Sequence, residues 1–150
     1  MMITQLDILN AINSEIVNAD NSAKAVYKQF CPKDFERPSH FIEALNYSVE
    51  PANCFTVKIT ASFFITSFVE VDERYISSAD DLLGMQEKVM NIFRKGYIQV
   101  GDRALTITSK TTDDGEAVLT EINLEFYDDK ITADEEQPIE NINLNLTEVD

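Results

Sequence analysis

The chain has 150 residues, 44% of them hydrophobic, which fits a single folded domain with a sizeable core. It carries 12 Lys and Arg against 27 Asp and Glu, a formal net charge of -15. Because nucleic-acid binding rests largely on Lys and Arg that neutralise phosphates, this balance argues against a DNA- or RNA-binding module. No apolar run approaches the ~18 to 20 residues of a membrane span, and the N-terminus lacks the basic and apolar regions of a signal peptide. We therefore expect neither membrane insertion nor export by the general route.

The N-terminal segment predicts a helix from about Gln5 to Asn18. Thr4 opens a T-x-x-D pattern that resembles a capping box, with Asp7 in the place of the usual Glu. Apolar residues then recur at helical spacing, namely Ile8, Leu9, Ile12 and Ile16. Two strands are predicted next, a short one over residues 25–30 and a longer one over residues 41–49.

The clearest signal in the chain is a long half-buried strand. Apolar residues occupy one parity, namely Phe55, Val57, Ile59, Ala61, Phe63, Ile65 and Val69. Polar residues occupy the other, namely Thr56, Lys58, Thr60, Ser62 and Thr66. Phe64 and Phe68 interrupt the polar face, which indicates that this end of the strand is covered on both sides, by this chain or by another.

A second helix is predicted after Ser77 and Ser78, with Asp80 and Asp81 in its first turn, where the helix dipole favours acids. Its apolar face comprises Leu82, Met85, Val89, Ile92 and Phe93, and its end is marked by Arg94, Lys95 and Gly96. Gly84 in its interior costs about 1 kcal/mol relative to alanine and indicates a close approach to a neighbouring backbone.

A hairpin closes the predicted fold. Residues 97–100 predict a short strand, and residues 104–110 and 117–127 flank Asp113-Asp114-Gly115, a strong hairpin signal. Val118, Ile122, Leu124 and Phe126 are predicted to point inward. Together the elements predict an α+β fold, a mainly antiparallel sheet of about five to six strands packed against two helices.

We expect a single α+β domain over residues 1–128 and an acidic linker with a C-terminal extension over residues 129–150. In the extension Ile142, Leu144 and Leu146 alternate with asparagines. This pattern indicates either a final strand, which would contact a neighbouring subunit, or a tail with some β character.

No motif of this sequence carries recognisable chemistry, so we predict no catalytic, cofactor-binding or metal-binding residues. His40 is the only histidine, so a histidine-based metal site lacks a second ligand of that kind. Ser/His/Asp catalysis would have to use His40, yet no G-x-S-x-G motif is present, and the simpler interpretation is a polar residue at a strand start. The four glycines match no phosphate-binding loop. Cys31 and Cys54 are interpreted as two reduced cysteines of a cytosolic protein.

Carboxylates cluster at four places, but none has the spacing of a calcium loop. Paired carboxylates could serve glycoside hydrolysis, although the chain has no tryptophan to stack on a sugar. Each cluster has a simpler interpretation. Glu70/Asp72/Glu73 would lie in a strand-end loop and Asp80/Asp81 at a helix N-terminus. Asp113/Asp114 would lie in a turn and Asp134/Glu135/Glu136 in a solvated linker.

The order and character of these elements resemble the tail terminator, or tail-completion, proteins of tailed phages and phage-tail-like particles. The resemblance covers roughly residues 2–128 and contains no catalytic motif. It rests on an opening helix, a short strand, a proline-led segment, a long strand with aromatic residues, an acid-capped helix and a closing hairpin, here residues 2–9, 25–30, 37–45, 55–68, 79–95 and 105–127. The extension after Asp128 departs from the short ending of that family.

The resemblance implies a homo-oligomeric ring, usually a hexamer, that caps the tail tube and joins it to the neck or head. The implied partners are further copies of the chain, the tail tube protein, and sheath or neck-collar proteins, with no sequence-specific nucleic acid and no membrane. Such proteins work by surface matching, so the resemblance implies neither enzyme activity nor a cofactor. It also implies assembly in the host cytoplasm and a place in a virion or phage-tail-like particle. The acidic charge would suit a lumen through which DNA passes.

Three other interpretations remain open at the level of sequence. The chain could be another neck or head–tail connector component, since such proteins share small α+β designs. It could be an acidic DNA mimic that inhibits a host nuclease, although its acids are spread along the chain. It could also be a small enzyme or ligand-binding module built around His40 and the acids near residues 70–73.

Overall fold

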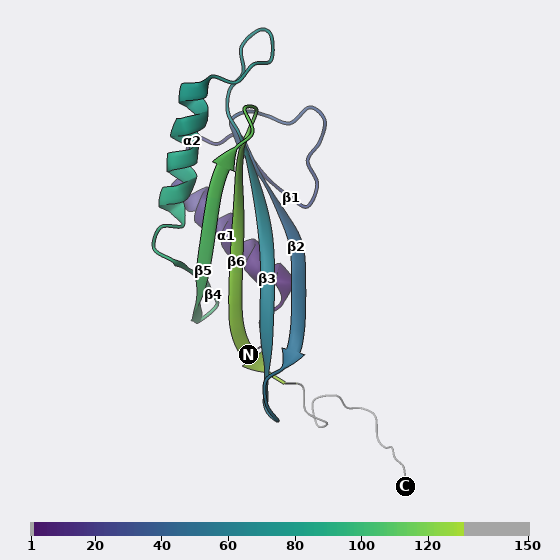
Figure 1. The fold of residues 1–150 in the computed structure, drawn as a ribbon. Helices are drawn as coiled ribbons and strands as arrows, with labels where there is room; N and C mark the ends of the chain where they lie inside the picture. Colours follow the sequence, from purple (N-terminus) through teal and green to yellow (C-terminus); the bar gives the residue numbers. More distant parts are fainter. Residues whose placement is uncertain (1, 131–150) are drawn as a thin grey trace.

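The computed structural model describes residues 2–130, which form a curled sheet of six strands with two helices on one face (Figure 1). The strand order is β1-β2-β3-β6-β5-β4, and of these pairs only β1–β2 is parallel. The elements are α1 (Gln5–Ala19), β1 (Ala25–Lys28), β2 (Ser39–Pro51), β3 (Thr56–Phe68), α2 (Ala79–Ile92), β4 (Tyr97–Val100), β5 (Arg103–Asp113) and β6 (Val118–Asp129). The predicted α+β class, with a mainly antiparallel sheet of five to six strands and two helices, is confirmed.

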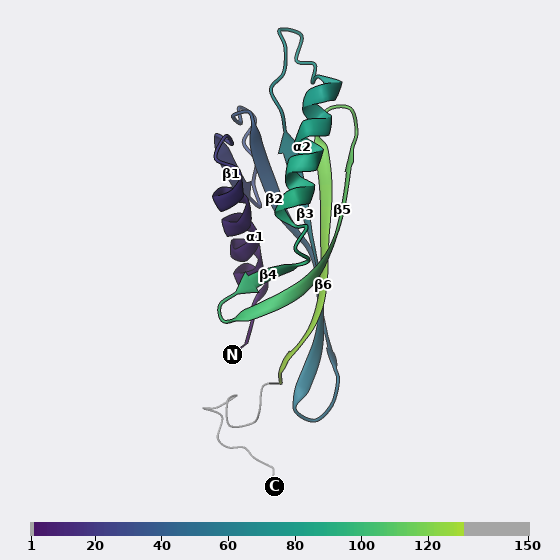
Figure 2. The same ribbon diagram turned by 90° about the vertical axis from the view of Figure 1, so that its left-hand side faces the viewer.

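The sheet has one covered face and one open face. Figure 2 shows α1 and α2 on the same side of the sheet, with the opposite side left uncovered. The core lies between these layers, and its largest fully buried side chains include Ile8, Phe63, Ile65, Val89 and Ile122. Since burying one such side chain contributes about 1.5 to 3 kcal/mol, this layer holds the helices on the sheet.

Helix α1 begins as predicted, with a capping box. The Asp7 backbone N–H donates to Thr4 Oγ1 over 3.1 Å, and the Thr4 N–H donates to Asp7 Oδ2 over 2.9 Å. Aspartate therefore replaces the usual glutamate without loss of either bond. The predicted apolar stripe is buried, and the helix ends at Ala19, one residue beyond the predicted end.

Strand β3 occupies the centre of the sheet, between β2 and β6. Four consecutive residues of its inward parity are buried, namely Ile59, Ala61, Phe63 and Ile65, as predicted. The prediction was wrong for Phe55, which is 77% exposed in the turn before the strand. The β2–β3 hairpin extends past the helices, so neither helix covers its tip (Figure 1).

The open face of β3 is covered at one end by this chain, which is one of the two predicted possibilities. The rings of Phe35 and Phe68 lie 4.2 Å apart, and the guanidinium of Arg37 lies 5.3 Å from the centre of the Phe68 ring. Phe64 is half-buried on the same face. The loop between β1 and β2 therefore folds over the end of β3.

Helix α2 is capped by Ser78, whose Oγ accepts a hydrogen bond from the Asp81 N–H over 3.4 Å. All five predicted apolar residues of its inner face are buried. The prediction of its end was wrong, because the helix ends at Ile92 with Phe93 as its C-cap, before Arg94 and Lys95. Gly96, with a φ of +80°, turns the chain into β4 as a residue in the left-handed region. The prediction for Gly84 was wrong, because a Cβ at this position would meet no atom of another described element within 4 Å.

Strands β2, β5 and β6 run somewhat longer than predicted, β4 has the predicted bounds, and β1 is shorter. Strands β5 and β6 pair as far as Asp113 and Val118, so the turn between them is confined to residues 114–117. Strand β1 stops at Lys28 because Gln29 adopts a φ of +67° and turns the chain. Of the predicted C-terminal extension, residues 131–150 lie outside the described part of the chain, and with them the Ile142–Leu146 pattern.

Candidate functional site

His40, the only histidine, lies fully buried at the start of β2. Its Nε2 lies 2.7 Å from Asp20 Oδ2, and its Nδ1 lies 2.8 Å from Ser67 Oγ. Because an ionised carboxylate only accepts hydrogen bonds, Nε2 donates to Asp20, and Nδ1 accepts from the Ser67 hydroxyl. The structure therefore assembles a Ser–His–Asp chain that the sequence left unassigned beyond His40.

These three residues are connected as in a hydrolase triad, but a substrate cannot reach them. Ser67 and His40 expose none of their surface, so no substrate atom can reach the hydroxyl oxygen. Asp20 is also bound by Lys88 Nζ at 3.2 Å and by Ser22 Oγ at 2.7 Å. The network joins the end of α1 to β2, β3 and α2, and its role is to satisfy buried polar groups.

The electrostatics of this network keep Asp20 ionised and His40 neutral near pH 7. Burial raises the pKa of Asp20, but hydrogen bonds from His40, Ser22 and Lys88 outweigh burial and lower it to about 2. Burial lowers the pKa of His40 below its usual value of 6.5, and the opposing effect of Asp20 is smaller. Both groups therefore bind protons more weakly in the folded chain than in the unfolded one.

We expect the folded state to lose stability steadily as the pH falls from about 7 to about 2. Below pH 6.5 the unfolded chain protonates His40 while the buried ring resists, and between pH 3.8 and about 2 the same holds for Asp20. The stability that each group contributes is fully present above its pH range and is lost as the pH falls through that range. Urea midpoints measured at unit steps of pH test this, and an optimum of stability below pH 5 would contradict it.

The predicted carboxylate clusters have structural roles where the structure describes them. Asp72 Oδ1 accepts hydrogen bonds from the backbone N–H groups of Arg74 and Ile76, at 2.8 and 3.0 Å. Asp114 Oδ1 does the same for Glu116 and Ala117 in the β5–β6 turn. Among residues 2–130 no group of three or more His, Cys, Asp or Glu is placed to hold a metal ion. The cluster at residues 134–136 lies outside this part.

The two predicted reduced cysteines are both free thiols. Cys31 is half-buried in the loop between β1 and β2, and Cys54 is exposed in the β2–β3 turn. Neither joins the buried Ser–His–Asp chain, so they add no nucleophile to it.

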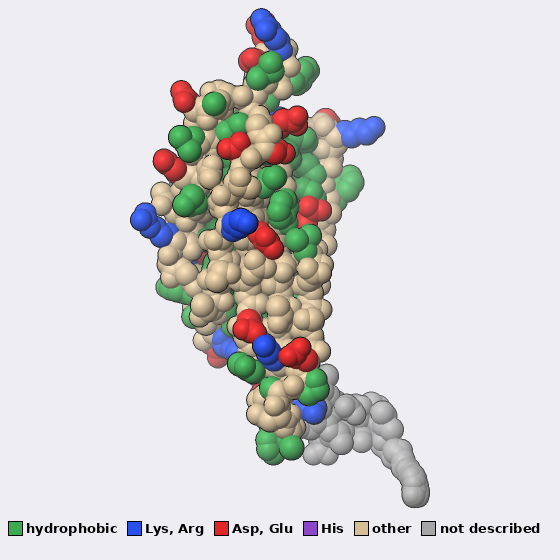
Figure 3. Space-filling model, in the orientation of Figure 1, with side chains coloured by type: hydrophobic (Ala, Val, Ile, Leu, Met, Phe, Trp, Pro, Cys, Tyr) green, Lys and Arg blue, Asp and Glu red, His purple; other side chains and the backbone are tan. Residues whose placement is uncertain are grey.

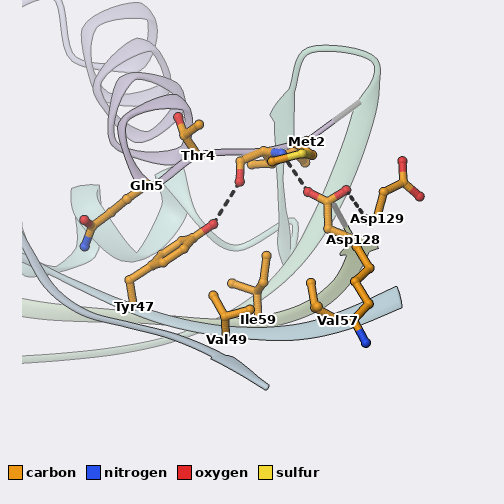
Figure 4. Close-up of a pocket in the computed structure, with 11 residues that line it drawn as sticks. Met2, Thr4, Gln5, Tyr47, Val49, Val57, Ile59, Asp128 and Asp129 are labelled. Atoms are coloured by element: carbon orange, nitrogen blue, oxygen red, sulfur yellow. Dashed lines mark hydrogen bonds between the residues drawn. The ribbon is translucent and has the colours of Figure 1, made fainter. Parts of the chain in front are cut away.

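An apolar groove of about 510 Å³ opens on the helix side of the sheet, at the end where α1 begins (Figure 4). Its floor consists of inward-facing side chains of β2 and β3, and its walls are the N-terminal segment and the last residues of β6. The lining residues with apolar side chains are Met2, Ile3, Tyr47, Val49, Val57 and Ile59. Val49 is 55% exposed and Met2 is 47% exposed, which leaves a hydrophobic surface open to solvent.

Two side chains fix the N-terminal wall of this groove. The Ile3 N–H donates to Asp128 Oδ2 over 2.6 Å, and the Tyr47 hydroxyl donates to the Ile3 carbonyl over 2.8 Å (Figure 4). Burial, together with the nearby Asp128 carboxylate, raises the pKa of Tyr47, so its phenol stays a donor. The extended residues before α1 are thereby held across the sheet, and the groove is a formed feature of the fold.

An unpaired strand edge borders the groove. Strand β1 pairs with β2 only from Ser39 to Ile42, and Gln29 Oε1 then accepts a hydrogen bond from the Ala44 N–H. Within residues 2–130, no strand pairs with the outer side of residues 45–51. An edge of this kind offers backbone N–H and C=O groups to another strand.

The open face of the sheet is polar in the middle. Ser62 of β3 donates a hydrogen bond to the amide oxygen of Asn123 over 2.8 Å, and Thr60 and Thr108 lie on the same face. Figure 3 shows this uncharged polar band, with hydrophobic side chains gathered above it and at the lower tip. Single large apolar side chains project from the loops, among them Phe30, Phe55 and Tyr75. These exposed side chains are candidate contact points.

Comparison with known proteins fixes the context of these surfaces. A family model described as "Phage tail terminator protein" matches residues 7–138. The chain belongs to the phage tail terminator family. The resemblance drawn from element order is confirmed, and the match includes every strand and nearly all of α1. No curated protein matches the chain.

Membership gives the protein a structural role in the phage tail, a virion-associated location and association with other tail proteins. Tail terminators are a family of structural proteins and not of enzymes. Within residues 2–130 no helix is long and apolar enough to cross a membrane. We expect this tail terminator to act through contact surfaces, and the groove and the β2 edge are candidates for them among residues 2–130.

Proposed function

We propose that this tail terminator assembles into a hexameric ring that caps the tail tube and joins it to the neck or head. The family match over residues 7–138 carries the proposal. A ring of this kind needs a head-to-tail interface that closes on itself, so each subunit must present two different surfaces to its neighbours. The polar open face and the groove side of the sheet are two such surfaces.

A joining subunit also needs contact points at both ends, and the shape of the molecule supports this. Strand β3 spans the length of the molecule, with the turn at residues 52–55 at one end and the loop at residues 69–78 at the other (Figure 1). Phe55 in the turn is 77% exposed, and Tyr75 in the loop is 85% exposed. We infer that one end contacts the tube and the other contacts the neck.

The loop that carries Tyr75 is built to present it. Tyr75 has a φ of +62°, a backbone conformation that costs a non-glycine residue energy. Hydrogen bonds from the Arg74 and Ile76 N–H groups to Asp72, and from the Tyr75 N–H to the Asp72 carbonyl over 2.9 Å, hold this conformation. This geometry supports a Tyr75 side chain that is held ready for contact before binding, in preference to one that becomes ordered only on binding.

The acidic composition supports a passage for DNA through the ring. A formal charge of -15 on each chain repels phosphates, so DNA in a lumen lined by such subunits would slide without binding.

Purified protein mixed with polymerising tail tube protein tests the proposal. We expect a mass of about six chains by light scattering, and tubes whose growth stops at one capped end in electron micrographs. Phe55→Asp and Tyr75→Asp form a matched pair, because both replace an exposed aromatic side chain in a loop. We expect one to abolish capping and the other to leave it intact while weakening binding to the neck.

A monomer that leaves the length distribution of tubes unchanged would contradict the proposal. Binding to neck proteins without any effect on tubes would move the protein to another role in tail completion or head–tail connection.

A further inference from the structure

We propose that the groove and the free edge of β2 receive the C-terminal segment Ile142–Leu146 of a neighbouring copy. The inference rests on the proposed ring and names a contact that would close it. In this arrangement the segment adds a strand beside residues 45–51 and places its apolar side chains over Tyr47 and Val49.

The chemistry of the edge suits strand addition. A strand added to a sheet edge is bound by its backbone, while alternate side chains enter a pocket on one face. Tyr47 and Val49 of β2 face the groove, whereas Asn46 and Ser48 belong to the opposite parity and are exposed. A segment that fits must therefore be apolar on one parity and polar on the other.

The C-terminal segment has this alternation. Its apolar residues share one parity, and its asparagines share the other, namely Ile142, Leu144 and Leu146 against Asn141, Asn143 and Asn145. The apolar parity would cover the groove, and the amides would continue the polar band of the open face. Residues 141–147 carry no charge, so docking would bury no ionised group of the segment itself.

The length of the connection allows the segment to reach a neighbour as well as its own β2 edge. The described chain ends at Lys130 on the rim of the groove, where its N–H donates to the Phe55 carbonyl over 2.9 Å. A return to the chain's own β2 edge crosses about three strand spacings, roughly 14 Å, which about four extended residues span. Residues 131–141 could reach about 36 Å when extended.

The charge of the connection favours a neighbour over the same chain. Asp134, Glu135 and Glu136 lie in it, and the exit site on β6 carries Asp128 and Asp129. Like charges along a linker favour extended conformations, and the acids of the linker repel those at the exit. Arms that leave one subunit and bind the next form a head-to-tail contact, which a closed ring requires.

Disulfide trapping tests the contact directly. In full-length protein with Cys31→Ser and Cys54→Ser, we expect the pair Val49→Cys and Leu144→Cys to form intermolecular disulfides, seen as a ladder on a non-reducing gel. The matched pair Val49→Cys and Asn143→Cys should give little, because the two side chains leave opposite faces of the sheet. A monomer band alone, whether free or internally bridged, would overturn the proposal.

Assembly of single variants separates this inference from the ring itself. We expect Leu144→Asp to raise the concentration of half-assembly by at least about tenfold, whereas Asn143→Asp, with the same added charge, changes it by less than about threefold. If the unaltered chain forms rings and Leu144→Asp forms them equally well, the strand contact is wrong and the ring stands. If the unaltered chain remains a monomer, both proposals fail.

Discussion

Replacing Asp20 with alanine lowers the free energy of unfolding by about 3 kcal/mol, because the variant leaves buried donors without their acceptor. The His40 Nε2–H would lose its partner at a position with no exposed surface. Lys88 and Ser22 would lose the same carboxylate. Urea denaturation followed by circular dichroism at pH 7 measures the effect.

Two further variants make this result specific. Asp20→Asn keeps an oxygen that accepts a hydrogen bond from His40, so we expect it to lower the free energy of unfolding less than Asp20→Ala does. Glu87→Ala removes an exposed carboxylate from α2 and should change stability by no more than about 0.5 kcal/mol. A loss below about 1 kcal/mol for Asp20→Ala would mean that the network contributes little to folding.

The features that sequence predicted well are those set by neighbouring residues. The cap of α1 depends on Thr4 and Asp7, and the cap of α2 depends on Ser78, all within one helical turn. The inward and outward faces of β3 can be predicted from its alternating apolar and polar residues alone. The β5–β6 turn can be predicted from Asp114 and Gly115 alone. Such signals do not depend on how the sheet is ordered.

The Ser–His–Asp chain escaped prediction because its members meet only through the sheet register. His40 pairs directly with Ser67 across β2 and β3, and Asp20 reaches them from the end of α1. Nothing near residue 40 or residue 67 in the sequence fixes this register. Once the register is known, however, the His40–Ser67 contact follows from cross-strand geometry.

The groove also escaped prediction, although the sequence contained a signal for it. Helix α1 has 15 residues and spans about 22 Å, whereas β3 has 13 residues and spans about 43 Å. α1 alone cannot cover the length of the strand, and α2 lies toward the opposite end from the β2–β3 turn, so inward residues near that turn remain open (Figure 1). Val57 shares the apolar parity of the long strand, and with Val49 it lines the uncovered end.

Replacing Asp128 with alanine lowers stability by about 2 to 3 kcal/mol and releases the N-terminal wall of the groove. The Asp128 carboxylate accepts from the Ile3 N–H and lies 3.4 Å from the Arg103 guanidinium, while only 6% of the residue is exposed. Its loss leaves the buried Ile3 amide without an acceptor and removes the ion pair with Arg103, which keeps its hydrogen bond to the Tyr127 carbonyl. We expect faster amide hydrogen exchange at residues 3–5, with the strands of the sheet unchanged.

Tyr47→Phe is the matched control for this variant, because it removes one neutral hydrogen bond to the same residue. We expect it to cost about 1 kcal/mol and to increase exchange at residues 3–5 less than Asp128→Ala does. If the segment is part of the surface that neighbours bind, Asp128→Ala should also weaken ring assembly more than Tyr47→Phe. Unchanged exchange at residues 3–5 in Asp128→Ala would show that other contacts hold the segment, and the groove would not depend on this carboxylate.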